Sequence, residues 1–263
     1  MVQGWTQETL KYAGGSLSVL KGGEGPPLLV LHGLGGNPGW MAYHEALAEN
    51  FTVYAPSHPG YDGSQSLSWI NSIAALSHYY LGLVQHLGWD RFSVVGFSMG
   101  GWLAAEMAAM CPHGLDRLVL VGAVGIRPRE GEIAELFNVS REAVEKLRFY
   151  DPGQVPDHDR FFGRELTLEE RGQERLNREM GSRLCWKPYM HNPNLPHFLT
   201  KVSTPTMVVW GREDAIVPVE CGGLYKEALS KATLKVIDNC GHAPQSEKPS
   251  EFLDIVVPFL RGS

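Results

Sequence analysis

The residues most able to do chemistry lie in the pentapeptide Gly96-Phe97-Ser98-Met99-Gly100. An apolar run before it predicts a buried strand, and a stretch rich in small residues after it predicts a helix. A serine between glycines at such a junction is typical of a sharp, strained turn that exposes the hydroxyl as a nucleophile. The turn also places the Met99 N–H at a helix N-terminus, where negative charge is favoured. The alternative is a tight turn in which Ser98 only caps the helix.

A serine hydroxyl is a weak nucleophile until a base takes its proton, so a partner histidine is required. Of the ten histidines, only His242 follows the last predicted strand. An imidazole can accept a proton and return it near neutral pH. Gly241 before it permits a tight loop that delivers the ring to Ser98. His32 also follows a predicted strand and is the main rival for this role.

A carboxylate that orients the base is expected at another strand end, because an open α/β sheet gathers its chemistry at the carboxyl ends of its strands. Asp214 stands at such a position, in a Gly-Arg-Glu-Asp sequence that follows an apolar run. The adjacent Glu213 is chemically capable of the same role. Nucleophile, acid and base then follow in the chain order Ser98, Asp214, His242.

Together these motifs resemble the α/β-hydrolase fold superfamily, in its serine-nucleophile branch with a helical cap (esterases, lactonases and carbon–carbon-bond hydrolases). The resemblance covers nearly the whole chain, from His32-Gly33 through Gly211-Arg212-Glu213-Asp214 to Gly241-His242-Ala243-Pro244 and the C-terminal helix. It implies that Ser98 is the nucleophile and His242 the base, and it favours Asp214 over Glu213 as the acid. One departure is Asp62, which takes a position where the family usually has glycine, and we expect it to affect only a loop near the sheet edge.

An oxyanion hole needs two N–H groups aimed at the position where negative charge develops. Met99 supplies one as the residue after the nucleophile. The resemblance implies that Leu34 supplies the other, with flexible backbone at Gly33, Gly35 and Gly36. It also implies a structural role for His32 beside this loop.

The elements that must position these residues follow from the hydrophobic pattern. Short apolar runs alternate with helical patterns, which predicts an α/β fold with a mostly parallel central sheet flanked by helices. Residues 9–12 and 16–21 are expected to pair antiparallel at one edge. The predicted strands are 27–31, 51–55, 91–96, 115–124, 205–211 and 233–238, and the predicted helices are 40–49, 67–87, 99–110, 220–229 and 249–260.

The strand pattern breaks between residues 126 and 202, where the sequence is polar, charged and helical, as in 141–148 and 166–180. This stretch is too long for an ordinary connection. We therefore predict an α/β-hydrolase core formed by residues 1–125 and 203–263, with an inserted helical cap over the side where Ser98 points. The alternative is a helical extension that plays no part in substrate choice.

Composition excludes several classes of partner. The 263 residues include 23 basic and 29 acidic side chains, a net charge of −6, which argues against nucleic acid and anionic membranes. Pro38 interrupts a glycine pattern that could otherwise cradle a phosphate. Four scattered cysteines without a Cys-x-x-Cys motif indicate reduced thiols, of which Cys240 is the best placed to line a pocket. No signal or membrane-spanning run is visible.

We therefore expect a cytoplasmic enzyme that acts on a small molecule without metal or cofactor, as a monomer or a homodimer. The resemblance argues against dehalogenases and epoxide hydrolases of this fold, because those enzymes use aspartate at the position of Ser98. The expected reaction is hydrolysis of a small carboxylic ester or lactone through an acyl-enzyme.

Two alternatives remain open. One is a meta-cleavage carbon–carbon hydrolase, because Arg183 and Trp186 resemble residues that some of those enzymes use. Against it, their base is usually followed by tryptophan, and here Ala243 follows. The other is a hydrolase-like small-molecule receptor that keeps the triad but turns over slowly.

Large apolar side chains near the predicted site suggest a modest, apolar acyl group. We expect these residues to contact substrate, although core packing explains Trp40 and Trp102 equally well. The set is Trp40, Phe97, Trp102, Trp186 and Val217.

Overall fold

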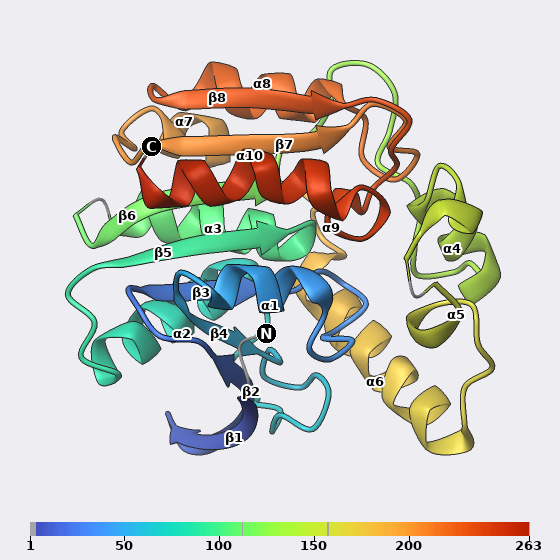
Figure 1. The fold of residues 1–263 in the computed structure, drawn as a ribbon, viewed down its shortest axis with the longest axis horizontal. Helices are drawn as coiled ribbons and strands as arrows, with labels where there is room; N and C mark the ends of the chain where they lie inside the picture. Colours follow the sequence, from blue (N-terminus) through green and yellow to red (C-terminus); the bar gives the residue numbers. More distant parts are fainter. Residues whose placement is uncertain (1–3, 112, 157, 263) are drawn as a thin grey trace.

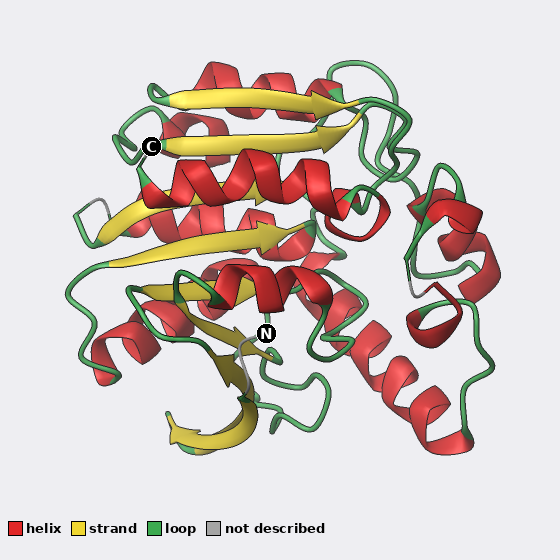
Figure 2. Ribbon diagram, viewed as in Figure 1, coloured by secondary structure: helices red, strands yellow, loops and turns green. Residues whose placement is uncertain are grey.

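The computed structural model describes residues 4–111, 113–156 and 158–262. In this described part of the chain, eight strands form one sheet in the order β1-β2-β4-β3-β5-β6-β7-β8 (Figure 1, Figure 2). The strands β1, β2 and β4 pair antiparallel, and the others pair parallel. This confirms the mostly parallel sheet with an antiparallel edge. The bounds are β1 Trp5–Tyr12, β2 Gly15–Gly22, β3 Pro27–Leu31, β4 Thr52–Pro56, β5 Phe92–Phe97, β6 Leu115–Val121, β7 Thr206–Gly211 and β8 Ala232–Ile237.

The central strands of the sheet are buried on both faces, and successive side chains of each strand point to opposite sides. In β3, Leu29 and Leu31 join one apolar core, and Leu28 and Val30 join the other. The helices α1 (Ala42–Ala48) and α10 (Pro249–Arg261) cover one face. The helices α2 (Ile73–His86), α3 (Met99–Met110) and α8 (Glu220–Ala228) cover the other, behind the sheet in Figure 1. The three-layer arrangement explains the near-continuous apolar strands.

Two predicted elements are shorter than expected. Helix α2 begins at Ile73 and not near residue 67, because the Ser72 hydroxyl accepts the Ala75 N–H at 3.2 Å and caps the helix there. Leu67 and Ile70 are buried in a turn before it, which gave them helical spacing without a helix. Strand β6 ends at Val121 and not at residue 124, because Gly122 turns the chain with a φ of +51°.

The segment between β6 and β7 is helical, and we refer to residues 126–202 as the helical insertion. Its helices α4 and α5 lie beyond the carboxyl ends of the strands, and α6 runs obliquely below them (Figure 1). Helix α7 instead packs against α3 and α8 of the core. The bounds are α4 Arg141–Arg148, a 3₁₀ turn Pro152–Gln154, α5 His158–Phe161, α6 Leu168–Cys185 and α7 Leu195–Leu199.

A short helix α9 (Pro244–Glu247) follows β8 and is absent from the expected elements. Across the residues that the structure describes, none of the helices combines the length and apolar character needed to cross a membrane.

Candidate active site

Ser98 occupies the turn between β5 and α3, with φ 52° and ψ −114°. This conformation is strained for any residue with a side chain and is typical of functional sites. The neighbouring glycines permit it: a Cβ on Gly96 would lie 2.3 Å from the Gly100 carbonyl oxygen, and a Cβ on Gly100 would lie 2.2 Å from that of Leu31. The serine hydroxyl does not cap the helix. The turn therefore holds Ser98 in a strained conformation and does not use its hydroxyl as a helix cap.

His242 and Asp214 meet beyond the ends of β8 and β7. The imidazole Nδ1 lies 2.8 Å from Asp214 Oδ2. The other carboxylate oxygen accepts the N–H groups of Ile216 at 2.9 Å and Val217 at 2.8 Å. The Asp214 side chain is fully buried, and these three hydrogen bonds fix its orientation. Glu213 instead accepts the Cys240 N–H at 2.9 Å.

The pairing with Asp214 leaves Nε2 as the imidazole nitrogen available to a substrate or to Ser98. His242 and Ser98 line the same cavity. Ser98 Oγ makes no hydrogen bond to any described residue, and catalytic contacts of this kind often tighten only once substrate is bound. The backbone of His242 is fixed, because its N–H donates to the Arg148 carbonyl at 2.7 Å.

His32 cannot compete for the role of base, because both of its ring nitrogens are occupied. Nδ1 lies 2.7 Å from the Gly33 carbonyl, and Nε2 accepts the His58 N–H at 2.9 Å. The ring lies against that of His58, with the two ring centroids 3.7 Å apart and the planes tilted by 36°. Burial lowers the pKa of His32, which keeps the imidazole neutral. Its position matches the structural role that the resemblance implied.

Two backbone N–H groups near Ser98 are unused. Neither the Leu34 N–H nor the Met99 N–H donates a hydrogen bond within the described residues. Leu34 lines the cavity, and a Cβ on its neighbour Gly33 would lie 3.8 Å from Ser98 Oγ. Met99 is the first residue of α3, whose leading N–H groups have no partner inside the helix. Two such donors beside a serine can stabilise an oxyanion.

Comparison with known proteins agrees with this geometry. Residues 28–255 match the model of the alpha/beta hydrolase family. The chain belongs to this family. A 2-hydroxy-6-oxononadienedioate/2-hydroxy-6-oxononatrienedioate hydrolase of Pseudomonas putida is 31% identical over 90% of this chain and 89% of its own length.

Solved structures show the same fold. A bacterial membrane phospholipase A superposes with a TM-score of 0.84 at 25% identity, over 98% of this chain and 86% of its own. A 2-hydroxy-6-oxo-6-phenylhexa-2,4-dienoate hydrolase from Rhodococcus sp. superposes with a TM-score of 0.79 at 24% identity, over 98% and 99%. This chain is thus a hydrolase by family.

The cavity of this α/β-hydrolase has a volume of about 420 Å³ and a mixed wall, in which apolar surface exceeds polar surface. Charged side chains from the helical insertion lie beside the apolar ones, so the pocket is not lined by apolar residues alone. Those charged residues are Arg141, Glu145, Arg148, Arg164, Glu170, Glu174 and Arg178.

Of the expected substrate contacts, Phe97 lines the cavity of the α/β-hydrolase and four others do not. Trp40 stacks on Trp5 at 5.8 Å and donates to Glu45. Trp102 is buried on α3 and donates to Glu106 at 3.0 Å. Both tryptophans pack against the core, where a carboxylate accepts each indole N–H.

The other two expected contacts, Trp186 and Val217, are displaced for different reasons. Trp186 is half exposed and packs edge-on against Phe137, away from the cavity. Val217 is fully buried, and it serves the site only through its N–H to Asp214. Cys240 is also buried outside the cavity wall, and burial raises the pKa of its thiol. Cys240, the thiol best placed by sequence to line a pocket, therefore does not line this cavity.

Three residues that sequence analysis did not assign to the site lie at the cavity of the α/β-hydrolase: Asp62, Asn177 and Arg148. Arg148 Nη2 would lie 3.2 Å from a Cβ on Gly35, next to the Leu34 loop. For Asp62 the departure from glycine was a usable signal. Asn177 and Arg148 lie in the helical insertion, where no motif distinguishes them from other polar helix residues.

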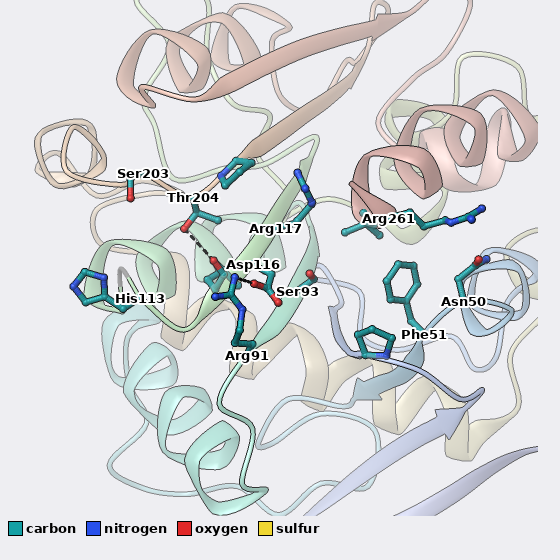
Figure 3. Close-up of a pocket in the computed structure, with 14 residues that line it drawn as sticks. Asn50, Phe51, Arg91, Ser93, His113, Asp116, Arg117, Ser203, Thr204 and Arg261 are labelled. Carbon is teal, nitrogen blue, oxygen red and sulfur yellow. Dashed lines mark hydrogen bonds and ion pairs between the residues drawn. The ribbon is translucent and has the colours of Figure 1, made fainter. Parts of the chain in front are cut away.

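A second cavity of about 620 Å³ lies at the amino ends of β5, β6 and β7, the opposite end of the sheet from Ser98. Figure 3 shows Arg91 turned toward Asp116, with which it forms an ion pair. His113 also lines it, but no hydrogen bond joins His113 to a carboxylate in the described ranges. This cavity lacks the pairing that makes a histidine a directed base. Likewise, the described side chains form no cluster of three or more His, Cys, Asp or Glu residues able to hold a metal ion.

Proposed function

We propose that this protein is a serine hydrolase that cleaves small carboxylic esters or lactones through an acyl-enzyme. The observation that carries the proposal is the His242–Asp214 pair, held at 2.8 Å, which shares one cavity with the strained Ser98. The unused N–H groups of Leu34 and Met99 support it, because an acyl transfer develops negative charge on the carbonyl oxygen.

In the first half of the reaction, Ser98 Oγ bonds to the carbonyl carbon and its proton moves to His242 Nε2. Asp214 stabilises the imidazolium that forms. The N–H groups of Leu34 and Met99 hold the oxyanion. The bond from the carbonyl carbon to the alcohol oxygen then breaks, and His242 returns the proton to that oxygen. The alcohol leaves, or stays attached as part of the acyl group when the substrate is a lactone.

In the second half, a water molecule attacks the acyl carbon while His242 takes a proton from the water. The bond to Ser98 Oγ breaks, and His242 returns this proton to the serine. The carboxylic acid leaves and the resting enzyme is restored. No step requires an oxidant, a reductant or a metal ion.

Carbon–carbon bond hydrolysis is the second candidate, because a relative with 31% identity is named for such a substrate. The placement of Arg183 weighs against it. Arg183 is exposed and donates to the Ser68 carbonyl, and neither it nor Trp186 lines the cavity. The two insertion residues that resembled those of the carbon–carbon hydrolases are therefore not positioned to touch a substrate beside Ser98.

A substrate panel separates the candidates. We expect wild-type protein to hydrolyse 4-nitrophenyl acetate, 4-nitrophenyl butyrate or a small lactone, and Ser98→Ala to reduce the rate to background. Cleavage of 2-hydroxy-6-oxonona-2,4-dienedioate, followed by loss of its visible absorbance, would favour the second candidate if it far exceeded ester turnover. If wild-type protein hydrolysed no ester or lactone faster than Ser98→Ala, the proposal would be refuted and a receptor would be favoured.

A further inference from the structure

Two polar side chains outside the Leu34 loop hold that loop in place. Asp62, in the loop after β4, accepts the Asn37 N–H through Oδ2 at 2.6 Å. Its Oδ1 accepts Asn177 Nδ2 from helix α6 at 2.7 Å, and its N–H donates to Asn177 Oδ1 at 3.3 Å. Asn177 Nδ2 also donates to the Gly35 carbonyl at 3.3 Å. One asparagine thus joins three segments that are distant in sequence.

The Leu34 loop needs such support because it is rich in glycine. Gly33, Gly35 and Gly36 leave its backbone with more conformational freedom than any other residue type would. A hydrogen bond from the Gly36 N–H to Gly33 O at 3.2 Å closes only one turn of it. Gly36 has a φ of +93°, and a Cβ there would lie 2.4 Å from both Asn177 Nδ2 and Asp62 Oδ2. The loop and its two polar partners are closely packed.

Helix α6 touches the same loop a second time, one turn further along. Gly181 lies four residues after Asn177, so both face the same side of the helix. A Cβ on Gly181 would lie 2.3 Å from Leu34 Cδ1, so the Leu34 side chain fills the space that the glycine leaves. Asn177 is 4% exposed, so water could not replace the hydrogen bonds of its amide if these partners were lost. Leu34 is therefore held by α6 at its side chain and at the carbonyl of the next residue.

We propose that Asn177, with Asp62 as its anchor on the core, is a positioning residue that aims the Leu34 N–H at the oxyanion. This inference rests on the proposed function. According to this inference, the oxyanion hole is complete only when helix α6 is packed against the Leu34 loop. The donors of an oxyanion hole accelerate reaction only when they are fixed before charge develops. A substrate that contacts α6 and keeps it packed against the core would therefore also keep the oxyanion hole complete.

The first test replaces Asn177 with leucine, which has a similar shape but no hydrogen bonds. For 4-nitrophenyl acetate we expect kcat to fall about 10- to 100-fold, below the loss seen when an oxyanion donor is deleted outright. KM should stay within about twofold. The affinity for a boronic acid, whose adduct with Ser98 places an oxygen in the oxyanion hole, should fall by the same factor as kcat/KM.

The matched control is Arg183→Met, which removes another contact between α6 and the core, to the Ser68 carbonyl and not to the loop. We expect it to retain wild-type kcat and boronic acid affinity. Asp62→Asn is the second variant, because it keeps the shape of the side chain but cannot accept from both Asn37 and Asn177. It should reproduce the loss in kcat if Asn177→Leu does not fold.

Hydrogen exchange gives a readout that does not depend on turnover. We expect the peptide covering residues 33–39 to exchange faster in Asn177→Leu than in wild type or Arg183→Met, with the sheet peptides unchanged. Wild-type kcat in both loop variants, an equal loss in Arg183→Met, or unchanged exchange at 33–39 would overturn the inference. Absence of ester turnover in wild-type protein would instead refute the proposed function, and the exchange experiment would still test the loop.

Discussion

His242 Nδ1 lies 2.8 Å from Asp214 Oδ2, and two backbone N–H groups fix the other oxygen of that carboxylate. The direction of the proton in this contact is therefore set: Nδ1 donates, and Nε2 is left to accept from Ser98. A substitution that makes residue 214 a hydrogen-bond donor would move the imidazole proton from Nδ1 to Nε2.

Asp214→Asn makes that change with little alteration in shape. Its Oδ1 would still accept from Ile216 and Val217, so the amide nitrogen would face Nδ1 and force the proton to Nε2. We expect kcat for an ester to fall about 10³- to 10⁴-fold with KM little altered. Glu213→Gln is the control, because its partner is the Cys240 N–H and not the imidazole. Similar losses in both variants would contradict the assignment of Asp214.

The glycines of the Ser98 turn should be irreplaceable for steric reasons. In Gly100→Ala the new methyl group would lie 2.2 Å from the Leu31 carbonyl oxygen, which is backbone and cannot move aside. We expect a loss of at least about 2 kcal/mol in the free energy of unfolding, together with loss of activity. Urea titration measures the first and ester hydrolysis the second.

Gly172→Ala provides the comparison, because nothing lies within 4 Å of its Cβ position on helix α6. There the substitution should stabilise the protein by up to about 1 kcal/mol through helix propensity. If Gly100→Ala were as well tolerated as Gly172→Ala, the turn around Ser98 would be less tightly packed than described.

Arg148 should favour substrates that carry a negative charge on the acyl chain. Its guanidinium lies over the rings of Phe149 at 5.9 Å and Phe162 at 5.4 Å, and it makes no hydrogen bond or ion pair within the described ranges. Burial and the nearby charge of Arg141 lower its pKa, while Glu145 and Glu174 favour its charged form without pairing with it. An anion in the cavity would supply the missing partner.

The measurement compares 4-nitrophenyl hydrogen glutarate with 4-nitrophenyl valerate, which have acyl chains of nearly equal length. We expect kcat/KM to favour the anionic ester by about 10-fold in wild type, from one charge-assisted hydrogen bond. Arg148→Met should abolish the preference, and Arg183→Met, with the same change in net charge, should keep it. A preference for the neutral ester in wild type would be inconsistent with this role.

His44 should make stability depend on pH. It is buried on α1, its Nδ1 accepts the Met41 N–H at 3.0 Å, and burial lowers its pKa to about 3. The unfolded chain binds a proton below pH 6.5 that the folded chain does not, so stability is full above pH 6.5 and is lost as the pH falls toward 3. The loss is about 1.4 kcal/mol per pH unit from this residue.

His44→Asn keeps an acceptor near the position of Nδ1 but cannot take up a proton. Its free energy of unfolding should therefore fall less steeply between pH 6 and pH 4, by about 1.4 kcal/mol per unit. Urea titrations at each pH give both slopes. Parallel slopes would show that His44 does not carry this dependence.

Much of the fold could be predicted from sequence because strands buried on both faces read as short apolar runs, as in β3 and β5. The errors arise at ends that local contacts decide. Leu67 and Ile70 have helical spacing, but the Ser72 cap starts α2 later. Gly122 ends β6 early through a positive φ that the apolar pattern does not register.

The site divides in the same way. Ser98, Asp214 and His242 stand at strand ends in recognisable motifs, so their meeting could be anticipated. The part of the cavity wall that α4 and α6 contribute could not, because polar residues of those helices carry no motif. Trp102 and Trp186 illustrate this: their size suggested a pocket, but their partners place one in the core and the other at the surface.

The most direct measurement is rapid-quench mass spectrometry of the protein mixed with 4-nitrophenyl butyrate. The structure predicts a burst of 4-nitrophenol and a transient mass increase of one butyryl group, mapped to the peptide that contains Ser98. Ser98→Ala should show neither, and Asp214→Asn should form the adduct slowly. An acyl group on any other residue, or turnover that persists in Ser98→Ala, would contradict the assignment of Ser98 as the nucleophile.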